Sequence, residues 1–417
     1  MTFNVREVAL GEVCEIKQGR YLAPNQMEPI PNEECLVPVI GGNGVLGYTD
    51  KSTYSYPVPL VTCRGSKCGL MQWAEHPTWI SNNAMAVYFK ENQGDNFFLH
   101  QYLLNSSFDD VITGSAQPQI TVSSLSLKRI MLPDLQTQKA ISSIMKNIDR
   151  KILINEALSR NLESIAQSIF KSWFIDFDPV HAKSRGEKPF GMDDETAELF
   201  PDSFEDSELG MIPKGWNVGT LSDLVGLQGG YAFKSSSWQE GGVPVVKIGS
   251  VKPGYIDLNQ VSYISDSVAS DISDLYRLPA GSILVGLTGY VGEVGLMHTN
   301  NPIPLLNQRV AQFVKNNESV QMIYVYCITR NPGFKIQVEQ LATGSAQQNV
   351  SIAQILSIQT VIPSEDLIVL FCNSHQSILN QLVALMDQNE SLKLIRDAIL
   401  PRLISGELQI PEELLVS

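Results

Sequence analysis

The chain has 417 residues and a formal net charge of −14, with 43% hydrophobic and 18% charged residues. This composition excludes a disordered or collagen-like chain, and the length predicts two or three domains. Apolar runs stay too short for a membrane-spanning helix, and the first residues lack the pattern of a signal peptide. Six cysteines are too few for a disulfide framework, so the cytoplasm is the expected compartment.

The negative charge is concentrated in one short stretch. Residues 176–214 contain 11 acidic and 4 basic residues, a balance of −7 that is half of the total. The larger segments on either side are close to neutral. The net charge therefore does not exclude nucleic acid as a partner, because a local basic surface can exist on a neutral domain.

The chain contains an internal repeat. Thr113-Gly-Ser-Ala-Gln117 recurs as Thr343-Gly-Ser-Ala-Gln347, and Pro133 and Pro363 lie at the same offset. Four further matches occur in the same order along both copies, three before these segments and one after them. They are Gln18-Gly-x-Tyr21 with Gln228-Gly-x-Tyr231, Val37-Pro-Val39 with Val243-Pro-Val245, Gly69-Leu-Met71 with Gly295-Leu-Met297, and Asn155-Glu156 with Asn389-Glu390. A duplicated fold with loops of unequal length explains this pattern.

In chain order, the pattern predicts five segments. Residues 1–133 have short β-type runs between turn signals, and they are expected to form a strand-rich domain with a helix near 96–106. A long helix is expected at 134–175, followed by an acidic linker at 176–214. Residues 215–363 repeat the strand-rich domain, with a helix near 319–330. Residues 364–417 repeat the long helix and add a tail.

Both long helices show heptad-like spacing. With Ile141, Ile148, Asn155, Leu162 and Ile169 at position a, apolar residues also recur at d, among them Leu158 and Ile165. Asn155 and Asn389 occupy the same heptad position. Two readings stay open for them: solvated residues beside a frayed seam, or buried amides that fix the helix register, and antiparallel packing favours the second.

The order of the segments favours an α+β architecture. Two similar strand-rich domains, separated by two long antiparallel helices, would form a pseudo-two-fold repeat with a coiled-coil spacer. Two similar surfaces held at a fixed spacing suit duplex DNA read at two half-sites.

The central region resembles a known family. Ile169-Phe-Lys-Ser-Trp-Phe-Ile-Asp-Phe-Asp-Pro-Val-His-Ala-Lys183, Gly191-Met-Asp-Asp-Glu-Thr-Ala-Glu-Leu-Phe-Pro201 and Ser207-Glu-Leu-Gly-Met-Ile-Pro-Lys-Gly-Trp216 are similar to the centre of type I restriction–modification specificity subunits. The duplicated Thr-Gly-Ser-Ala-Gln segments and the stretch Ile399-Leu-Pro-Arg-Leu-Ile-Ser-Gly-Glu-Leu408 resemble the same family.

The resemblance implies a non-catalytic subunit whose two domains each read one half of a gapped double-stranded DNA site. It also implies two modification (methyltransferase) subunits as partners, with S-adenosylmethionine bound by those partners, and two restriction subunits that can join the complex.

Motifs for a catalytic or metal site are weak in this chain. Asn331-Pro-Gly-Phe334 resembles an amino-methyltransferase motif but has Gly in place of the second Pro, so a turn at a helix end is the better interpretation. Cys63 and Cys68 lack a second pair at zinc spacing. We therefore expect no catalytic residue, no metal and no cofactor in this chain.

Side chains for DNA contact are predicted from residue type and turn-like context, because phosphates and base edges are bound by Arg, Lys, Asn, Gln and aromatic side chains. Arg64 and Arg309 rank highest. The candidates are Arg20, Tyr21, Asn43, Lys51, Arg64, Lys67, Asn82, Asn83, Tyr231, Lys234, Lys247, Lys252, Tyr290, Gln308 and Arg309.

Trp173 and Phe174 end the first long helix. Two readings are open for them, packing on their own domain or docking of a methyltransferase subunit. Gln117 and Gln347 suit a structural junction better than base readout, since the two domains should read different bases. The alternative for the whole chain is a two-headed protein adaptor without a direct DNA role.

Overall fold

The computed structural model describes residues 5–75, 77–114, 117–344 and 348–411. The chain divides into two compact units. Unit 1 consists of Met1–Ile152 and Ser391–Ser417, and unit 2 consists of Leu153–Glu390. Both units contain helices and strands, as expected for an α+β fold.

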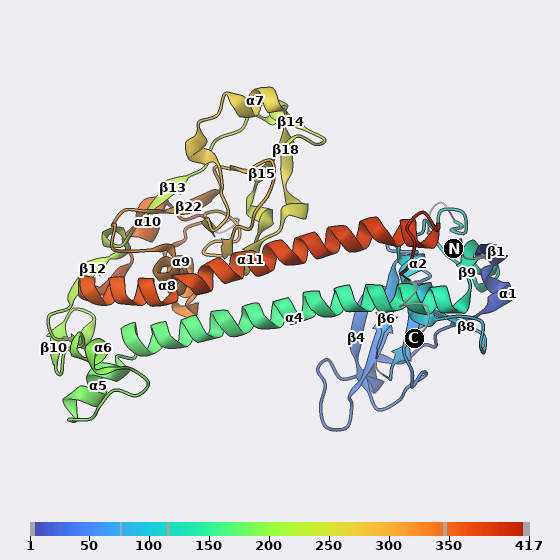
Figure 1. Cartoon of the computed structure of the whole chain (residues 1–417), viewed down its shortest axis with the longest axis horizontal. Coiled ribbons are helices and arrows are strands. Elements are labelled where there is room, and N and C mark those ends of the chain that lie inside the picture. The colour runs from blue at the N-terminus through green and yellow to red at the C-terminus, as the bar shows by residue number, and fades with distance from the viewer. Residues whose placement is uncertain (1–4, 76, 115–116, 345–347, 412–417) are drawn as a thin grey trace. The chain divides into compact units, whose positions relative to one another are not determined.

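Two long helices each contribute to both units (Figure 1). Helix α4 spans Leu135–Phe174 and α11 spans Glu365–Ile404, which confirms the expected long helices; both lie within the predicted ranges 134–175 and 364–417. Asp134 caps the start of α4, where its Oδ1 accepts from the backbone N of Thr137 at 2.9 Å. Pro401 lies in the last turn of α11, where the lost hydrogen bond costs least.

The two long helices contact each other in each unit. In unit 1, Arg396 Nη1 donates to Asp149 Oδ1 at 3.0 Å. In unit 2, Asn155 Nδ2 donates to Asn389 Oδ1 at 2.9 Å. A second contact in unit 2 joins the rings of Phe174 and Phe371, 5.4 Å apart. Within this unit, residue numbers rise along α4 while those of its partners fall along α11, so the predicted antiparallel pairing is confirmed.

The heptad assignment of α4 was wrong at position d. Leu158 and Ile165 are 44% and 51% exposed, whereas Ile152 and Ala166 are 7% and 0% exposed. The buried face of α4 is therefore formed by positions a and e of the heptad, where e directly follows d. The reason is that α4 packs on a globular domain as well as on α11, so its contact face is not the narrow seam of an isolated two-stranded coiled coil.

Unit 1 has a four-stranded sheet (β2-β8-β5-β6), a three-stranded sheet (β4-β3-β7) and the pair β1-β9. Its strands are β1 (Val5–Ala9), β2 (Cys14–Gln18), β3 (Val37–Gly41), β4 (Gly44–Thr49), β5 (Val58–Thr62), β6 (Met71–Ala74), β7 (Trp79–Ile80), β8 (Ala84–Phe89) and β9 (Arg129–Pro133). Its shorter helices are α1 (Leu10–Val13), α2 (Asn96–Leu104) and α3 (Val122–Ser126). Helix α2 confirms the helix expected near 96–106.

Unit 2 has a six-stranded sheet (β13-β22-β19-β20-β17-β16), a four-stranded sheet (β14-β18-β15-β21) and the pairs β12-β23 and β10-β11. Its strands are β10 (Phe204–Ser207), β11 (Gly210–Pro213), β12 (Asn217–Thr220), β13 (Val225–Gly229), β14 (Trp238–Gln239), β15 (Val243–Val246), β16 (Val251–Lys252), β17 (Gly254–Ile256), β18 (Ser262–Ile264), β19 (Ile283–Gly286), β20 (Val294–Leu296), β21 (Leu305–Leu306), β22 (Val310–Lys315) and β23 (Gln359–Ile362). Its shorter helices are α5 (Asp178–Ser184), α6 (Asp194–Glu198), α7 (Asp266–Ser270), α8 (Met322–Arg330), α9 (Pro332–Leu341) and α10 (Ile352–Leu356).

The internal repeat is visible in the topology of the two units. The antiparallel pair β1-β9 closes the domain of unit 1, and β12-β23 closes that of unit 2. Helices α3 and α10 follow the repeated Thr-Gly segments, and both begin with a capping box, on Thr121 and Ser351. Helix α8 confirms the helix expected near 319–330.

The acidic segment 176–214 is folded in unit 2. It contains α5, α6 and the β10-β11 hairpin. Val180 and Phe200 from this segment are 0% and 1% exposed and belong to the core that contains Phe174. Its apolar side chains therefore anchor it, although its net charge is strongly negative.

Candidate nucleic-acid interface

In unit 1, backbone hydrogen bonds bring several predicted DNA-contact residues together. The backbone N of Arg20 donates to the carbonyl of Ile80 at 2.8 Å, and that of Cys63 donates to Asn83 at 2.9 Å. Gly19 makes this approach possible, since a Cβ there would lie 2.2 Å from the Ser81 carbonyl oxygen. Arg20, Arg64 and Asn83 are all exposed around this junction.

Unit 2 builds the same junction from the same bonds. The backbone N of Tyr231 donates to Leu306 at 2.8 Å, and that of Leu287 donates to Arg309 at 3.0 Å. A Cβ on Gly230 would lie 2.2 Å from the Asn307 carbonyl oxygen, as for Gly19 in unit 1. We call this shared arrangement the junction frame. It consists of residues 19–20, 63–64 and 80–83 in unit 1, and of residues 230–231, 287–288 and 306–309 in unit 2.

The frame aligns the two units residue by residue. The paired positions are Arg20 with Tyr231, Arg64 with Thr288, Asn82 with Gln308, and Asn83 with Arg309. Arg64 and Arg309, which ranked highest from the sequence, therefore occupy neighbouring positions of the frame and not equivalent ones. Likewise, Tyr231 corresponds to Arg20, one residue before the Tyr21 suggested by the repeated motif.

Unit 2 adds an aromatic and cationic cluster beside its frame. Lys247 Nζ lies 3.6 Å from the centre of the Trp238 ring. Burial and the charge of Arg309 lower the pKa of Lys247. The ring of Tyr231 lies 5.1 Å from Phe233 and 5.5 Å from Tyr276.

Sequence reasoning did not find Tyr276. It lies far from Tyr231 along the chain, and no motif marks it. Arg277, the next residue, bridges to Leu305 of β21, and this pairing brings the segment to the frame.

Other predicted residues lie around the frames. Gly42, next to Asn43, is close to the frame, since a Cβ on it would lie 3.6 Å from Asn83 Cβ. Lys67 shares the turn that follows Arg64, where the backbone N of Cys68 donates to Gly65 at 3.0 Å. Tyr290 is 64% exposed, and its backbone N donates to the carbonyl of Thr288 at 3.0 Å.

Four other candidates make no hydrogen bond to a frame residue among the described residues, although Tyr21 directly follows Arg20 in the chain. Tyr21 is 69% exposed, and Lys51 and Lys234 are exposed as well. Lys252 Nζ donates to Gln260 Oε1 at 3.0 Å, on β16. Their contact with DNA stays a prediction.

Trp173 and Phe174 are engaged inside unit 2. Phe174 is 7% exposed, with Tyr324 and Phe371 rings at 5.3 and 5.4 Å. Trp173 is half-buried and packs on Phe200 at 5.3 Å. A docking role for this pair stays a prediction.

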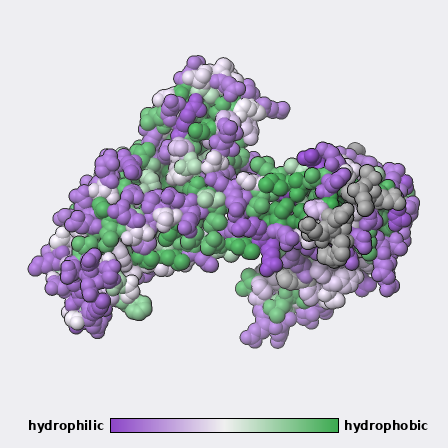
Figure 2. All heavy atoms as spheres, in the orientation of Figure 1, coloured by the Kyte–Doolittle hydropathy of each residue, from purple (hydrophilic) through white to green (hydrophobic). Residues whose placement is uncertain are grey.

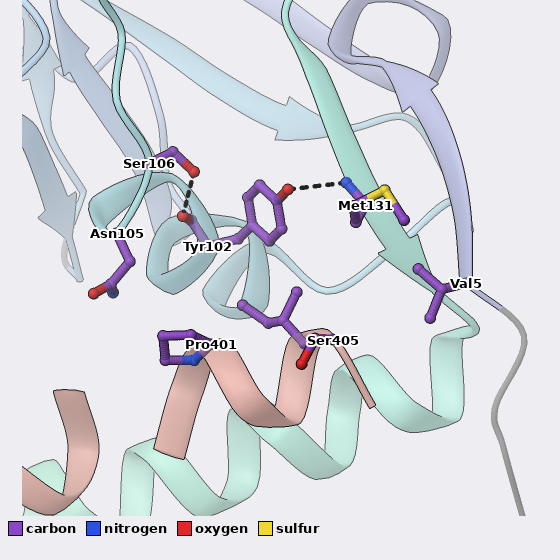
Figure 3. Close-up of a pocket in the computed structure, with 8 residues that line it drawn as sticks. Val5, Tyr102, Asn105, Ser106, Met131, Pro401 and Ser405 are labelled. Atoms are coloured by element: carbon purple, nitrogen blue, oxygen red, sulfur yellow. Dashed lines mark hydrogen bonds between the residues drawn. The ribbon is translucent and has the colours of Figure 1, made fainter. Parts of the chain in front are cut away.

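A pocket of about 360 Å³ lies in unit 1, where the end of α11 meets α2 and β9 (Figure 3). The backbone N of Met131 donates to the hydroxyl oxygen of Tyr102 at 2.9 Å. The pocket lining consists of Val5, Tyr102, Asn105, Ser106, Met131, Pro401, Ile404 and Ser405. These are apolar or neutral side chains, which suit packing better than acid–base chemistry.

The counterpart of Val5 in unit 2 is Trp216. Val5 pairs with Pro133, and Trp216 directly precedes Asn217, which pairs with Ile362 next to Pro363. Trp216 is 4% exposed and packs on Phe177 at 5.6 Å. The strand position that Val5 holds beside the pocket in unit 1 is thus held by a buried aromatic residue in unit 2.

The Asn331-Pro-Gly-Phe334 motif forms the predicted turn. Asn331 ends α8 and starts α9, and its Oδ1 accepts from the backbone N of Gly333 at 2.9 Å. Among the described residues, no group of three or more His, Cys, Asp or Glu side chains is arranged to hold a metal ion. Within the described ranges, no helix is both long and apolar enough to cross a membrane.

Comparison with known proteins decides the family. Residues 4–164 and 213–394 match the type I restriction modification DNA specificity domain, once for each copy of the repeat. This chain belongs to the type I restriction–modification specificity family. As a specificity subunit it carries two such domains, in agreement with recognition of a site in two parts.

Two curated relatives are specificity subunits. The HindI specificity subunit of Haemophilus influenzae is 29% identical over 332 residues, covering 70% of this chain and 71% of the relative. The MjaVIII specificity subunit of Methanocaldococcus jannaschii is 24% identical over 341 residues, covering 79% and 74%. The crystal structure of an S subunit from M. genitalium has a TM-score of 0.60 at 16% identity and covers 96% of both chains, so it shares the fold of this specificity subunit.

Proposed function

We propose that this chain is the non-catalytic subunit that reads DNA in a type I restriction–modification complex. Each of its two domains reads one half of a gapped double-stranded site. The complex contains two methyltransferase subunits, which bind S-adenosylmethionine and methylate adenine, and two restriction subunits can join it. The complex works in the cytoplasm.

One observation carries this proposal. The two junction frames share their backbone hydrogen bonds, but their side chains differ at each of the four paired positions, as the exposed Asn83 and Arg309 illustrate. Asn and Arg bind different base edges in the major groove, adenine and guanine respectively. A common scaffold with different donors and acceptors is what two unlike half-sites require.

The helices offer apolar surface for the partner subunits. Ile154, Leu158 and Ile165 are 50%, 44% and 51% exposed and lie on one face of α4, by their spacing. On α11, Leu394 and Ile395 are 71% and 49% exposed, and apolar residues gather over the part of α11 in unit 1 (Figure 2). Such patches on a helix favour docking of a partner helix.

Methylome sequencing of cells with and without this chain tests the proposal. We expect loss of one gapped adenine-methylation motif when the chain is deleted. Restoring the chain with a frame substitution, Arg309→Ala, should relax one half of that motif. An unchanged methylome would contradict the DNA-reading function and favour the protein adaptor.

A further inference from the structure

The repeated Thr-Gly segments lie beside both junction frames. In unit 1, Thr113 and Gln119 exchange two backbone hydrogen bonds of 2.8 Å, and the backbone N of Ile120 donates to Cys63 at 3.0 Å. Gln119 also bridges to Arg64. The repeated segment is therefore attached to the frame next to its exposed arginine.

Unit 2 repeats these bonds. Thr343 and Asn349 exchange two backbone hydrogen bonds of 2.9 Å, and Val350 donates to Leu287 at 2.9 Å. Asn349 bridges to Thr288, the counterpart of Arg64. We define the rim as Thr113, Gly114 and Gln117 in unit 1, with Thr343 and Gly344 as its counterpart in unit 2. All five rim residues are exposed. Gln347, the counterpart of Gln117, lies outside the described residues.

A purely structural role explains only some of the residues that are identical in the two repeated segments. Gly114 and Gly344 have φ of 86° and 108°, which favours glycine at both positions. Gln117 has no such constraint: it is exposed, and within the described part of the chain its side chain makes no hydrogen bond. The same glutamine in both copies points to the same external partner.

The difference in sequence conservation between the frame and the rim of the two units indicates which partner binds the rim. Frame side chains differ between the units, as expected for base readout, whereas the rim is identical. The part of DNA that is the same at any two half-sites is the phosphodiester backbone, which accepts hydrogen bonds from hydroxyl, amide and backbone N–H groups. Arg64 and Lys67, exposed nearby without an ion-pair partner among the described residues, add positive charge on this side.

We propose that the rim binds the phosphodiester backbone of DNA independently of sequence, with the Gln117 amide as a donor to a phosphate oxygen. This inference rests on the proposed function, because it requires that the frames face DNA. In this proposal the rim positions each domain on the duplex, and the frame reads the bases.

The test uses the full chain in complex with its methyltransferase subunits. Binding is measured for the cognate duplex and for a duplex with both half-sites scrambled, over a range of salt concentrations. The variants are Gln117→Ala and Gln117→Glu, and the control is Gln93→Ala. Gln93 is also exposed, but it follows β8 and so lies at the opposite end of that strand from Asn83.

We expect Gln117→Ala to weaken binding to both duplexes by the same factor, about tenfold, since one hydrogen bond to a charged group is lost. The salt dependence should stay unchanged, because a neutral amide releases no counterion. Gln117→Glu should bind more weakly still, and its deficit should shrink at higher salt as repulsion is screened. Gln93→Ala should bind as the wild type does.

Equal affinity of Gln117→Ala and wild type for both duplexes would overturn the proposal. So would a change in the ratio between the duplexes, which would make Gln117 a base-reading residue. Failure of the proposed function looks different: the wild-type complex itself would then bind cognate and scrambled duplexes equally.

Discussion

Asn155 of α4 and Asn389 of α11, 234 residues apart, hydrogen bond to each other inside unit 2, with Nδ2 of Asn155 2.9 Å from Oδ1 of Asn389. Asn155 is fully buried, and it also donates to Gln388 Oε1 at 2.7 Å. Its own Oδ1 has no partner among the described residues. A buried amide with an unsatisfied acceptor, paired with a half-buried one, stabilises little but favours a single register of the two helices.

Replacing both asparagines by leucine should therefore stabilise unit 2 and weaken the register. We expect Asn155→Leu with Asn389→Leu to raise the free energy of unfolding by about 1–2 kcal/mol, because apolar packing replaces desolvated amides. Denaturant unfolding measures this. Asn161→Leu, an exposed site on the same helix, is the control and should change stability little. A less stable double variant would show that the amide pair contributes net stability.

The frame predicts half-site-specific effects of single substitutions. Arg309→Ala should reduce discrimination by about 1–3 kcal/mol at positions of one half-site, since a bidentate contact to a base is lost. Asn83→Ala, its counterpart, should do so in the other half-site only. Methylation rates on duplexes with single base changes test this, and each variant serves as the control for the other. Relaxation of both half-sites by either variant would be incompatible with the frame.

Exchange of residues 1–133 for the same domain of another specificity subunit should change one half-site only. Strand β1 pairs with β9 along its whole length, from Val5 with Pro133 to Ala9 with Arg129, so this module closes on itself before α4 begins. Methylome sequencing of cells that carry the chimera gives the new motif. Simultaneous change of both halves would show that the domains do not read DNA separately.

Insertion of four residues in α4 after Asn161 should alter the gap between the half-sites or prevent assembly. The insertion adds about 6 Å of helix and turns the following residues by about 40°. The added length compares with roughly two base pairs at ~3.4 Å each. The recognised half-site sequences should stay the same. Normal assembly with the original gap would mean that these helices do not set the spacing.

His100 of α2 makes unit 1 sensitive to acid. Burial lowers the pKa of His100 to about 4, from the usual 6.5, and its Nδ1 has no hydrogen-bond partner among the described residues. The unfolded chain therefore binds a proton between pH 6.5 and 4 that the folded chain excludes, so stability is lost as pH falls through this window. The loss should be about 2 kcal/mol at pH 5.

Thermal unfolding of His100→Phe at pH 7 and pH 5 tests this. The ring of His100 lies 5.4 Å from Trp73, in surroundings that suit an aromatic replacement. The variant should lose less stability between the two pH values than the wild type does. His181→Gln, at an exposed site, should keep the wild-type difference. An equal pH dependence in His100→Phe and wild type would exclude His100 as the cause.

The sequence by itself determined two kinds of feature: local secondary structure and the internal repeat. Uninterrupted helix-forming stretches determine α4 and α11, because helix hydrogen bonds join residues four apart. The internal repeat in the sequence identifies both domains, and the central motifs indicate the family.

Only the tertiary structure decided which exposed side chains lie together. Arg20, Arg64 and Asn83 are distant along the chain and meet through bonds between separate strands and loops, which no local pattern encodes. The structure also showed that Asn83 and Arg309 hold equivalent positions in the two frames, which loops of unequal length conceal in the sequence. It showed as well that Ile165 is exposed, because packing against a domain, and not heptad spacing, selects the buried face of α4.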